Sequence, residues 1–239
     1  MILSIVIACY NEEKTIAEVL ERVNRVSLSE LGVQKEIIVV DDGSSDSTWQ
    51  ILQSVKDRYR IKLLRHEKNL GKGSAVRSSL SLVTGDIILI QDADMEYDPE
   101  DYPALLLPFV KDHANAVYGS RFLKDAHPKG MQPLFYMGNR FLTFLANFLY
   151  GLKITDEATC YKGFRTKILK SMNLECSEFD FCPEVTAKLA LKNIQIVEVP
   201  VKYFGRTVSA GKKISWKDAY QATRTLLKYW IKSKMGLKI

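Results

Sequence analysis

Residues 86–101 read DIILIQDADMEYDPED and combine an apolar strand, an acidic loop and a helix start. The run Asp86–Ile90 follows Gly85 and is apolar at consecutive positions after Asp86, which is typical of a strand buried on both faces. Six carboxylates follow within residues 91–101, so the negative charge gathers at the carboxyl end of the predicted strand.

Half of these carboxylates have a structural explanation. Asp98 precedes Pro99, and further acids follow at once, which is the pattern of an N-cap, a proline at the first helical position and acids facing the positive end of the helix dipole. The remaining carboxylates could belong to a solvated acidic loop. Three acids have no such structural role and are candidates for chemistry: Asp92, Asp94 and Glu96.

Apolar runs alternate with helical patterns along the first half of the chain, which predicts βαβ units and a parallel sheet. We expect helices over Thr15–Val26 and Thr48–Val55. The expected strands are Leu3–Ala8, Glu36–Val40, Ile61–Leu64, Asp86–Ile90 and Ala116–Gly119. The predicted fold class is therefore α/β, a single nucleotide-binding domain over residues 1–214 with a mostly parallel central sheet.

Polar clusters follow the expected strands each time. Tyr10-Asn11-Glu12 follows the first strand, Asp41-Asp42-Gly43-Ser44 the second, and Asp92-Ala93-Asp94 the fourth. Since ligands of parallel sheets bind at the carboxyl ends of the strands, the three clusters predict one site.

Composition restricts the partners. The chain of 239 residues is 46% hydrophobic, and no apolar run or signal-peptide pattern predicts export or a membrane span. The segment 202–239 holds ten Lys or Arg residues and one acid, so its net charge is +9. The whole chain carries only +6, so the remaining residues carry a net negative charge. No nucleic-acid-binding motif accompanies this basic tail, so an anionic membrane surface is the expected partner. We expect a cytoplasmic protein, peripheral at the inner face of the membrane.

Two segments are candidates for contact with that membrane. Leu134–Leu152 is apolar around most of a helix, so it predicts either a buried helix or a helix at the membrane interface. Residues 215–239 alternate aromatic and aliphatic residues with lysines and predict a basic amphipathic helix that associates with the membrane. The four cysteines lack metal spacing and predict buried thiols.

Asp92-x-Asp94 at a strand end places two carboxylates where they can hold one hard divalent cation, Mg²⁺ or Mn²⁺. Such an ion would neutralise a diphosphate. The pair alone is a short and weak motif, but the clusters at the neighbouring strand ends strengthen it.

The ordered motifs resemble the family 2 glycosyltransferases of the GT-A fold, in the branch of dolichyl-phosphate mannose synthases and polyprenyl-phosphate glycosyltransferases. The motifs that carry the resemblance are ACYNE at 8–12, VVDDGSSDST at 39–48, NLGKGSA at 69–75, QDADMEYDP at 91–99, VYGSRF at 117–122, GNR at 138–140, DEATCYKGFR at 156–165, FCPEVTAKLA at 181–190 and VEVPVKYFGRT at 197–207. Two departures are Ala8-Cys9, where many relatives have Pro before Tyr-Asn, and Glu96, where some have Gln.

The resemblance implies transfer of a sugar, with inversion, from a nucleotide donor to a polyprenyl phosphate. It places the metal on Asp92, Asp94 and Glu96. The nucleotide would lie near Ala8, Tyr10, Asn11, Glu12, Asp41, Asp42 and Lys72, with the choice between Asp41 and Asp42 for the base left open.

A phosphate acceptor is already anionic at neutral pH and needs no general base, whereas a hydroxyl acceptor does. The chemistry should then rest on Asp92 and Asp94 with the metal, and on arginines that hold the acceptor phosphate. The candidate arginines are Arg121, Arg140 and Arg206. The alternatives are a family 2 enzyme acting on a saccharide or protein hydroxyl, a nucleotidyltransferase, and a non-enzymatic nucleotide- or lipid-binding module.

Three other features have simpler interpretations. Gly71-Lys72-Gly73-Ser74 does not complete a phosphate-loop or dinucleotide motif and predicts the turn that opens a helix. We interpret His66 as an ordinary surface or core residue. Glu184, next to Pro183, is explained by helix capping as well as by a role in the site.

Overall fold

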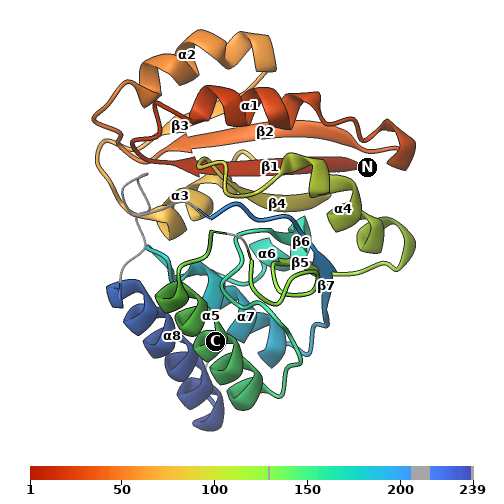
Figure 1. Ribbon diagram of the computed structural model, residues 1–239, viewed down its shortest axis with the longest axis vertical. Coiled ribbons are helices and arrows are strands. Elements are labelled where there is room, and N and C mark those ends of the chain that lie inside the picture. The colour runs from red at the N-terminus through yellow and green to blue at the C-terminus, as the bar shows by residue number, and fades with distance from the viewer. Residues whose placement is uncertain (129, 206–215, 238–239) are drawn as a thin grey trace.

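A computed structural model describes residues 1–128, 130–205 and 216–237, and its core is one mixed sheet (Figure 1). The strand order is β3-β2-β1-β4-β6-β5-β7, and β6 runs against its neighbours β4 and β5. The strands are β1 (Ile2–Cys9), β2 (Gln34–Asp41), β3 (Lys62–Arg65), β4 (Ile87–Asp92), β5 (Ala116–Ser120), β6 (Lys162–Arg165) and β7 (Ile196–Pro200).

Helices cover the sheet and extend beyond one end of it. In Figure 1, α1 and α2 lie beside the half of the sheet formed by β1, β2 and β3, and α5, α7 and α8 gather at the opposite end of the molecule. The helices are α1 (Ile16–Arg25), α2 (Thr48–Tyr59), α3 (Lys72–Ser79), α4 (Tyr102–Lys111), α5 (Pro133–Tyr150), α6 (Thr166–Lys170), α7 (Phe181–Leu191) and α8 (Trp216–Lys234), with short 3-10 turns η1 (Ser29–Leu31) and η2 (Pro99–Asp101).

The expected α/β fold is confirmed, and the first five strands lie within two residues of their predicted bounds. β1 is central, with β2 and β4 on its two sides, and its residues Leu3–Ile7 are almost free of solvent contact. A strand buried on both faces has no polar alternation, which is why the apolar runs in the sequence identify it.

The sheet register brings the polar clusters to one edge. Cys9 at the end of β1 pairs with Asp41 of β2, and Ala8 pairs with Asp92 of β4. The loops that follow these three neighbouring strands therefore begin at the same level, as the sequence predicts.

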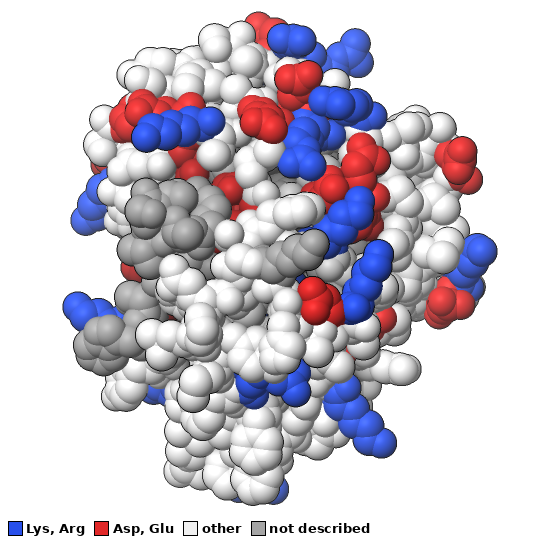
Figure 2. All heavy atoms as spheres, viewed as in Figure 1, with Lys and Arg blue, Asp and Glu red and all other residues white. Residues whose placement is uncertain are grey.

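α5 is amphipathic rather than fully buried. Its inner face buries Leu142, Thr143 and Ala146. Its outer face exposes large apolar side chains at a helical spacing: Leu134, Met137, Phe141, Phe144 and Phe148. Figure 2 shows the result as a largely uncharged area over α5, whereas acidic side chains concentrate in the upper half of the same view.

α8 packs against α5 and α7. Ala222, Leu226 and Tyr229 are buried in this contact, and the Tyr150 hydroxyl donates to the Leu226 carbonyl at 2.6 Å. The expected boundary between residues 214 and 215 lies outside the described residues. Within the described residues, no helix has the length and hydropathy of a membrane span.

Glu184 on α7 has a structural role. Its carboxylate accepts from the backbone N–H groups of Glu175 and Cys176, from the Tyr229 hydroxyl, and pairs with Lys188 at 2.8 Å. The carboxylate therefore joins α7 to α8, and it does not line the cavity described below.

Candidate active site

One cavity of about 560 Å³ lies between the carboxyl ends of β1, β2 and β4 and the helices α5, α7 and α8. Its polar wall carries Tyr10, Glu12, Asp42, Lys72, Asp92 and Asp94. Its apolar wall carries Met131, Leu134, Phe135, Met137 and Leu142 from α5 and the turn before it. The cavity thus offers charged groups at one side and hydrocarbon at the other.

The residues expected near the nucleotide divide into two groups. Ala8, Tyr10, Glu12, Asp42 and Lys72 line the cavity. Asn11 and Asp41 are outside its lining. The side-chain Oδ1 of Asn11 accepts from the Ser45 N–H at 2.8 Å, and the Asp41 carboxylate lies 3.1 Å from Arg65 Nε. Of the two adjacent aspartates, the structure therefore presents Asp42 to the cavity.

Asp42 fixes the loop that follows β3. Its carboxylate accepts from the backbone N–H groups of Leu70 at 3.0 Å and Gly71 at 2.8 Å. His66 Nδ1 lies 2.6 Å from the same carboxylate, and His66 Nε2 lies 2.9 Å from the Ser78 hydroxyl. His66, an ordinary residue by sequence, is thus part of the support for this wall.

Gly71 is required by a close approach of two backbone segments. It has a φ of +92°, and a Cβ at this position would lie 2.3 Å from the Ser177 carbonyl oxygen. Gly73 donates its N–H to the Glu178 carbonyl at 2.9 Å. The glycines therefore let the loop pack against residues 177–178, which supports the interpretation of a helix-opening turn.

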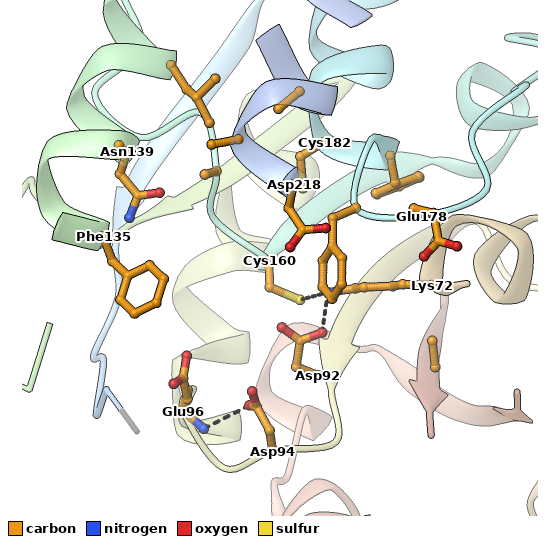
Figure 3. A pocket seen from close by; sticks show the side chains of 18 of the residues that line it. Lys72, Asp92, Asp94, Glu96, Phe135, Asn139, Cys160, Glu178, Cys182 and Asp218 are labelled. Carbon is orange, nitrogen blue, oxygen red and sulfur yellow. Dashed lines mark hydrogen bonds and ion pairs between the residues drawn. The ribbon is translucent and has the colours of Figure 1, made fainter. Parts of the chain in front are cut away.

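Lys72, the first residue of α3, pairs with the carboxylate of Asp92 at the end of β4 (Figure 3). Its Nζ also lies 3.5 Å from Cys160 Sγ. Burial works against the charge of Lys72, but the neighbouring Asp92 outweighs it and holds the pKa of the lysine well above its usual value. Burial and Asp92 raise the pKa of the Cys160 thiol, so Cys160 is neutral at physiological pH.

The acidic loop continues from Asp92 to Asp94 and Glu96. The Glu96 N–H donates to Asp94 Oδ1 at 3.1 Å, and the Tyr203 hydroxyl donates to Glu96 Oε2 at 2.8 Å. Within the described part of the chain, no three His, Cys, Asp or Glu side chains form a ready cluster of metal ligands. Mg²⁺ commonly uses one or two carboxylates together with substrate phosphates, so the pair Asp92 and Asp94 fits such an ion.

The predicted arginines have different environments. Arg121 is buried and forms two hydrogen bonds of 2.7 Å to Asp156, yet it lines the cavity. Arg140 on α5 is exposed, donates to the Thr155 carbonyl at 3.4 Å and is outside the cavity lining. Both arginines contact the Phe122 ring, since their guanidinium groups lie within 5.7 Å of its centroid. Arg206 lies outside the described residues.

Several lining residues were not predicted from sequence. Figure 3 shows Phe135 and Asn139 directed into the cavity from α5, with Asp218 of α8 on another side. Asn139 stands next to Arg140 in the GNR motif, so that motif contained a signal for it. The other unpredicted lining residues include Cys160, Glu178 and Cys182.

Two named proteins are similar to this chain in sequence. The chain is 29% identical to a dolichol-phosphate mannosyltransferase of Pyrococcus furiosus, over 94% of this chain and 62% of that protein. It is 28% identical to a UDP-N-acetylglucosamine–dolichyl-phosphate N-acetylglucosaminyltransferase of Methanococcus voltae, over 83% of this chain and 84% of the relative. The chain thus spans less than two thirds of the length of the first relative.

A solved structure shares the fold. Glucosyl-3-phosphoglycerate synthase from Mycobacterium tuberculosis, in complex with Mg²⁺ and uridine diphosphate, superposes with a TM-score of 0.67 at 19% identity, over 99% of this chain and 80% of the other. The family described as Glycosyl transferase family 2 matches residues 4–172, which is more than half of the chain. With the acidic strand ends and the cavity in place, this match shows that the chain belongs to glycosyl transferase family 2.

Proposed function

We propose that this chain transfers a sugar, with inversion at the anomeric carbon, from a nucleoside diphosphate donor to a polyprenyl phosphate at a membrane surface. The observation that carries the proposal is the two-sided cavity: carboxylates and Lys72 line one wall, and apolar residues of α5 line the other. A polar donor fits the first wall and an isoprenoid chain the second. The names of the two relatives, which include dolichol phosphate and dolichyl phosphate, support this choice of acceptor.

We assign the donor diphosphate to the rim formed by Asp92, Asp94 and Lys72, with Mg²⁺ or Mn²⁺ held by Asp92 and Asp94. Glu96 is the third proposed ligand, and Tyr203 orients its carboxylate. When bound, the metal supplies Lewis-acid stabilisation of the leaving diphosphate. Lys72 adds a second positive charge at the same place.

The acceptor phosphate is proposed to lie near Arg121 and Arg140, with Arg206 as a further candidate. Asp156 neutralises Arg121 and holds it in a fixed orientation. Arg140 is exposed at the border of the apolar face of α5. A phosphate headgroup there would place its prenyl chain along the apolar helix, and a planar guanidinium suits such a phosphate.

Membrane association follows from the same arrangement, since the acceptor is a lipid. The outer face of α5 is the proposed lipid contact, and the lysines of α8 would face anionic headgroups. The protein would then be peripheral at the inner face of the membrane.

The test uses matched lipids. A panel of UDP- and GDP-sugars is offered with polyprenyl phosphate, with the corresponding polyprenol or with a saccharide, in Mg²⁺, Mn²⁺ or EDTA, and the labelled product is measured. We expect labelling of the phosphate lipid alone, dependent on metal and abolished by Asp94→Asn, which removes a charge at almost constant volume. Labelling of polyprenol, or of a saccharide hydroxyl with no labelling of the phosphate lipid, would contradict the proposal.

A further inference from the structure

Lys72 pairs with the acidic end of β4, and the loop before it is held by Asp42, directly after β2. The ammonium group of Lys72 pairs with Asp92 at the end of β4 and lies 6.0 Å from the centroid of the Phe179 ring. The side chain of Lys72 is 18% exposed and that of Asp92 is 21% exposed, so the pair is largely shielded from water but open to the cavity. Both are positions where a ligand in the cavity would make contact.

The backbone holds Lys72 in this place. The residues before it, Leu70 and Gly71, donate to the carboxylate of Asp42, and Gly73 after it donates to the Glu178 carbonyl. Gly71 packs so closely against residues 177–178 that a side chain there would collide with backbone. The loop is therefore anchored on both sides of Lys72, while the lysine side chain itself retains rotatable bonds.

We infer that Lys72 is a built-in counter-ion of Asp92 that makes the binding of a divalent metal depend on the donor diphosphate. The inference rests on the proposed function for the placement of the metal at Asp92. The ammonium group and the metal would use the same carboxylate. Two positive charges at adjacent positions repel each other, and the repulsion is strong in a shielded site.

A diphosphate removes this conflict because it brings negative charge to both cations. Lys72 can then move from Asp92 to a phosphate oxygen, which leaves the Asp92 carboxylate to bind the metal. By linkage, a ligand that strengthens metal binding is itself bound more tightly in the presence of metal, by the same factor. Lys72 would thus favour joint occupancy by metal and donor over metal alone.

The test measures Mn²⁺ binding rather than turnover. Electron paramagnetic resonance reports free Mn²⁺ during titration of the wild type, Lys72→Met and Lys72→Arg, each with and without UDP or GDP. We expect Lys72→Met to bind Mn²⁺ in the absence of nucleotide about tenfold more tightly than the wild type. The gain in Mn²⁺ affinity on adding nucleotide should be about tenfold smaller in Lys72→Met than in the wild type. Lys72→Arg keeps the charge and should behave like the wild type.

The controls separate the possible failures. Lys56→Met removes an exposed lysine on α2 outside the cavity lining and controls for net charge. Lys72→Gln repeats the measurement with a polar side chain, and thermal melts verify folding. If Asp92→Asn weakens Mn²⁺ binding while Lys72→Met and Lys72→Gln leave it unchanged, the counter-ion role is overturned and the metal assignment stands. If Asp92→Asn also has no effect, both are overturned.

Discussion

Arg121 and Arg140 both contact the Phe122 ring, but substitutions at the two positions would have different effects. Arg121 is the fixed partner of the buried carboxylate of Asp156, which also accepts from the Arg121 backbone N–H at 3.0 Å. Lysine at this position keeps the charge but loses the two parallel hydrogen bonds, so the fold as well as the site would respond. Arg140 has one long bond to a carbonyl and is exposed. It is the cleaner probe of the acceptor.

We predict that Arg140→Lys raises the KM for polyprenyl phosphate about tenfold, because lysine cannot bind the phosphate through a planar fork. The donor KM and the thermal midpoint should remain close to wild type. Steady-state kinetics with each substrate varied in turn measures this, with Arg58→Lys on the distant helix α2 as the matched control. A rise in donor KM with unchanged acceptor saturation would assign Arg140 to the nucleotide instead.

At the scale of elements, Glu36 on β2 ties together the beginnings of four strands. Its carboxylate accepts from the Ser4 hydroxyl of β1, from Lys62 of β3 at 2.6 Å and from the backbone N–H groups of Thr84 and Gly85 ahead of β4. Burial alone would raise its pKa, but the hydrogen bonds from Lys62, Ser4 and Thr84 outweigh it and lower the pKa of Glu36 to about 2.

This shift gives a pH-dependent prediction. A carboxyl group with a lowered folded-state pKa stabilises the protein above its unfolded pKa, and the contribution is lost as the pH falls toward the folded value. Because Glu36 is only partly buried, solvent screens part of this effect, and Glu36→Gln should lower the free energy of unfolding by on the order of 1–2 kcal/mol near pH 7. Urea denaturation should show this difference shrinking below about pH 4.5. A difference that stays constant down to pH 3 would show that the carboxylate charge is not involved.

The elements that the sequence predicts are those with local signals. β1 to β5 are apolar runs or follow turns, and the helix start at Asp98 is confirmed by its side chain accepting from the Glu100 N–H. β6 and β7 were not predicted. β6 is only Lys162–Arg165 and has two basic residues, and β7 is half-exposed without clear alternation. Their pairing depends on distant partners rather than on their own pattern.

At the scale of the whole molecule, the cavity is closed by segments far apart in sequence. The strand-end carboxylates were predictable because parallel strands bring their carboxyl ends to one edge. Asp218 and Ala222 of α8 were not predictable as cavity residues, because only the packing of α8 on α5 and α7 places them there. The same packing buries Leu226 and Tyr229, so removal of the helix would damage the core and the site together.

A sharper test of membrane contact therefore changes exposed residues alone. The rings of Phe144 and Phe148 stack with centroids 6.1 Å apart, and the two residues are 65% and 75% exposed. Burying each ring in lipid is worth about 1.5–3 kcal/mol, whereas in water neither contributes to the core. We predict that the double variant Phe144→Ser and Phe148→Ser loses at least tenfold in affinity for anionic vesicles while its melting temperature is unchanged.

Co-sedimentation with vesicles containing phosphatidylserine or only phosphatidylcholine measures this affinity. Leu107→Ser on α4 is the control, since Leu107 is also exposed but lies away from α5. High salt should weaken binding of the wild type to anionic vesicles, because it screens the lysines of α8 from the headgroups. The salt effect should persist in the double variant, since its basic residues remain. If the double variant binds both vesicle types as tightly as the wild type, the exposed face of α5 does not contact lipid, and the acceptor must enter the cavity by another route.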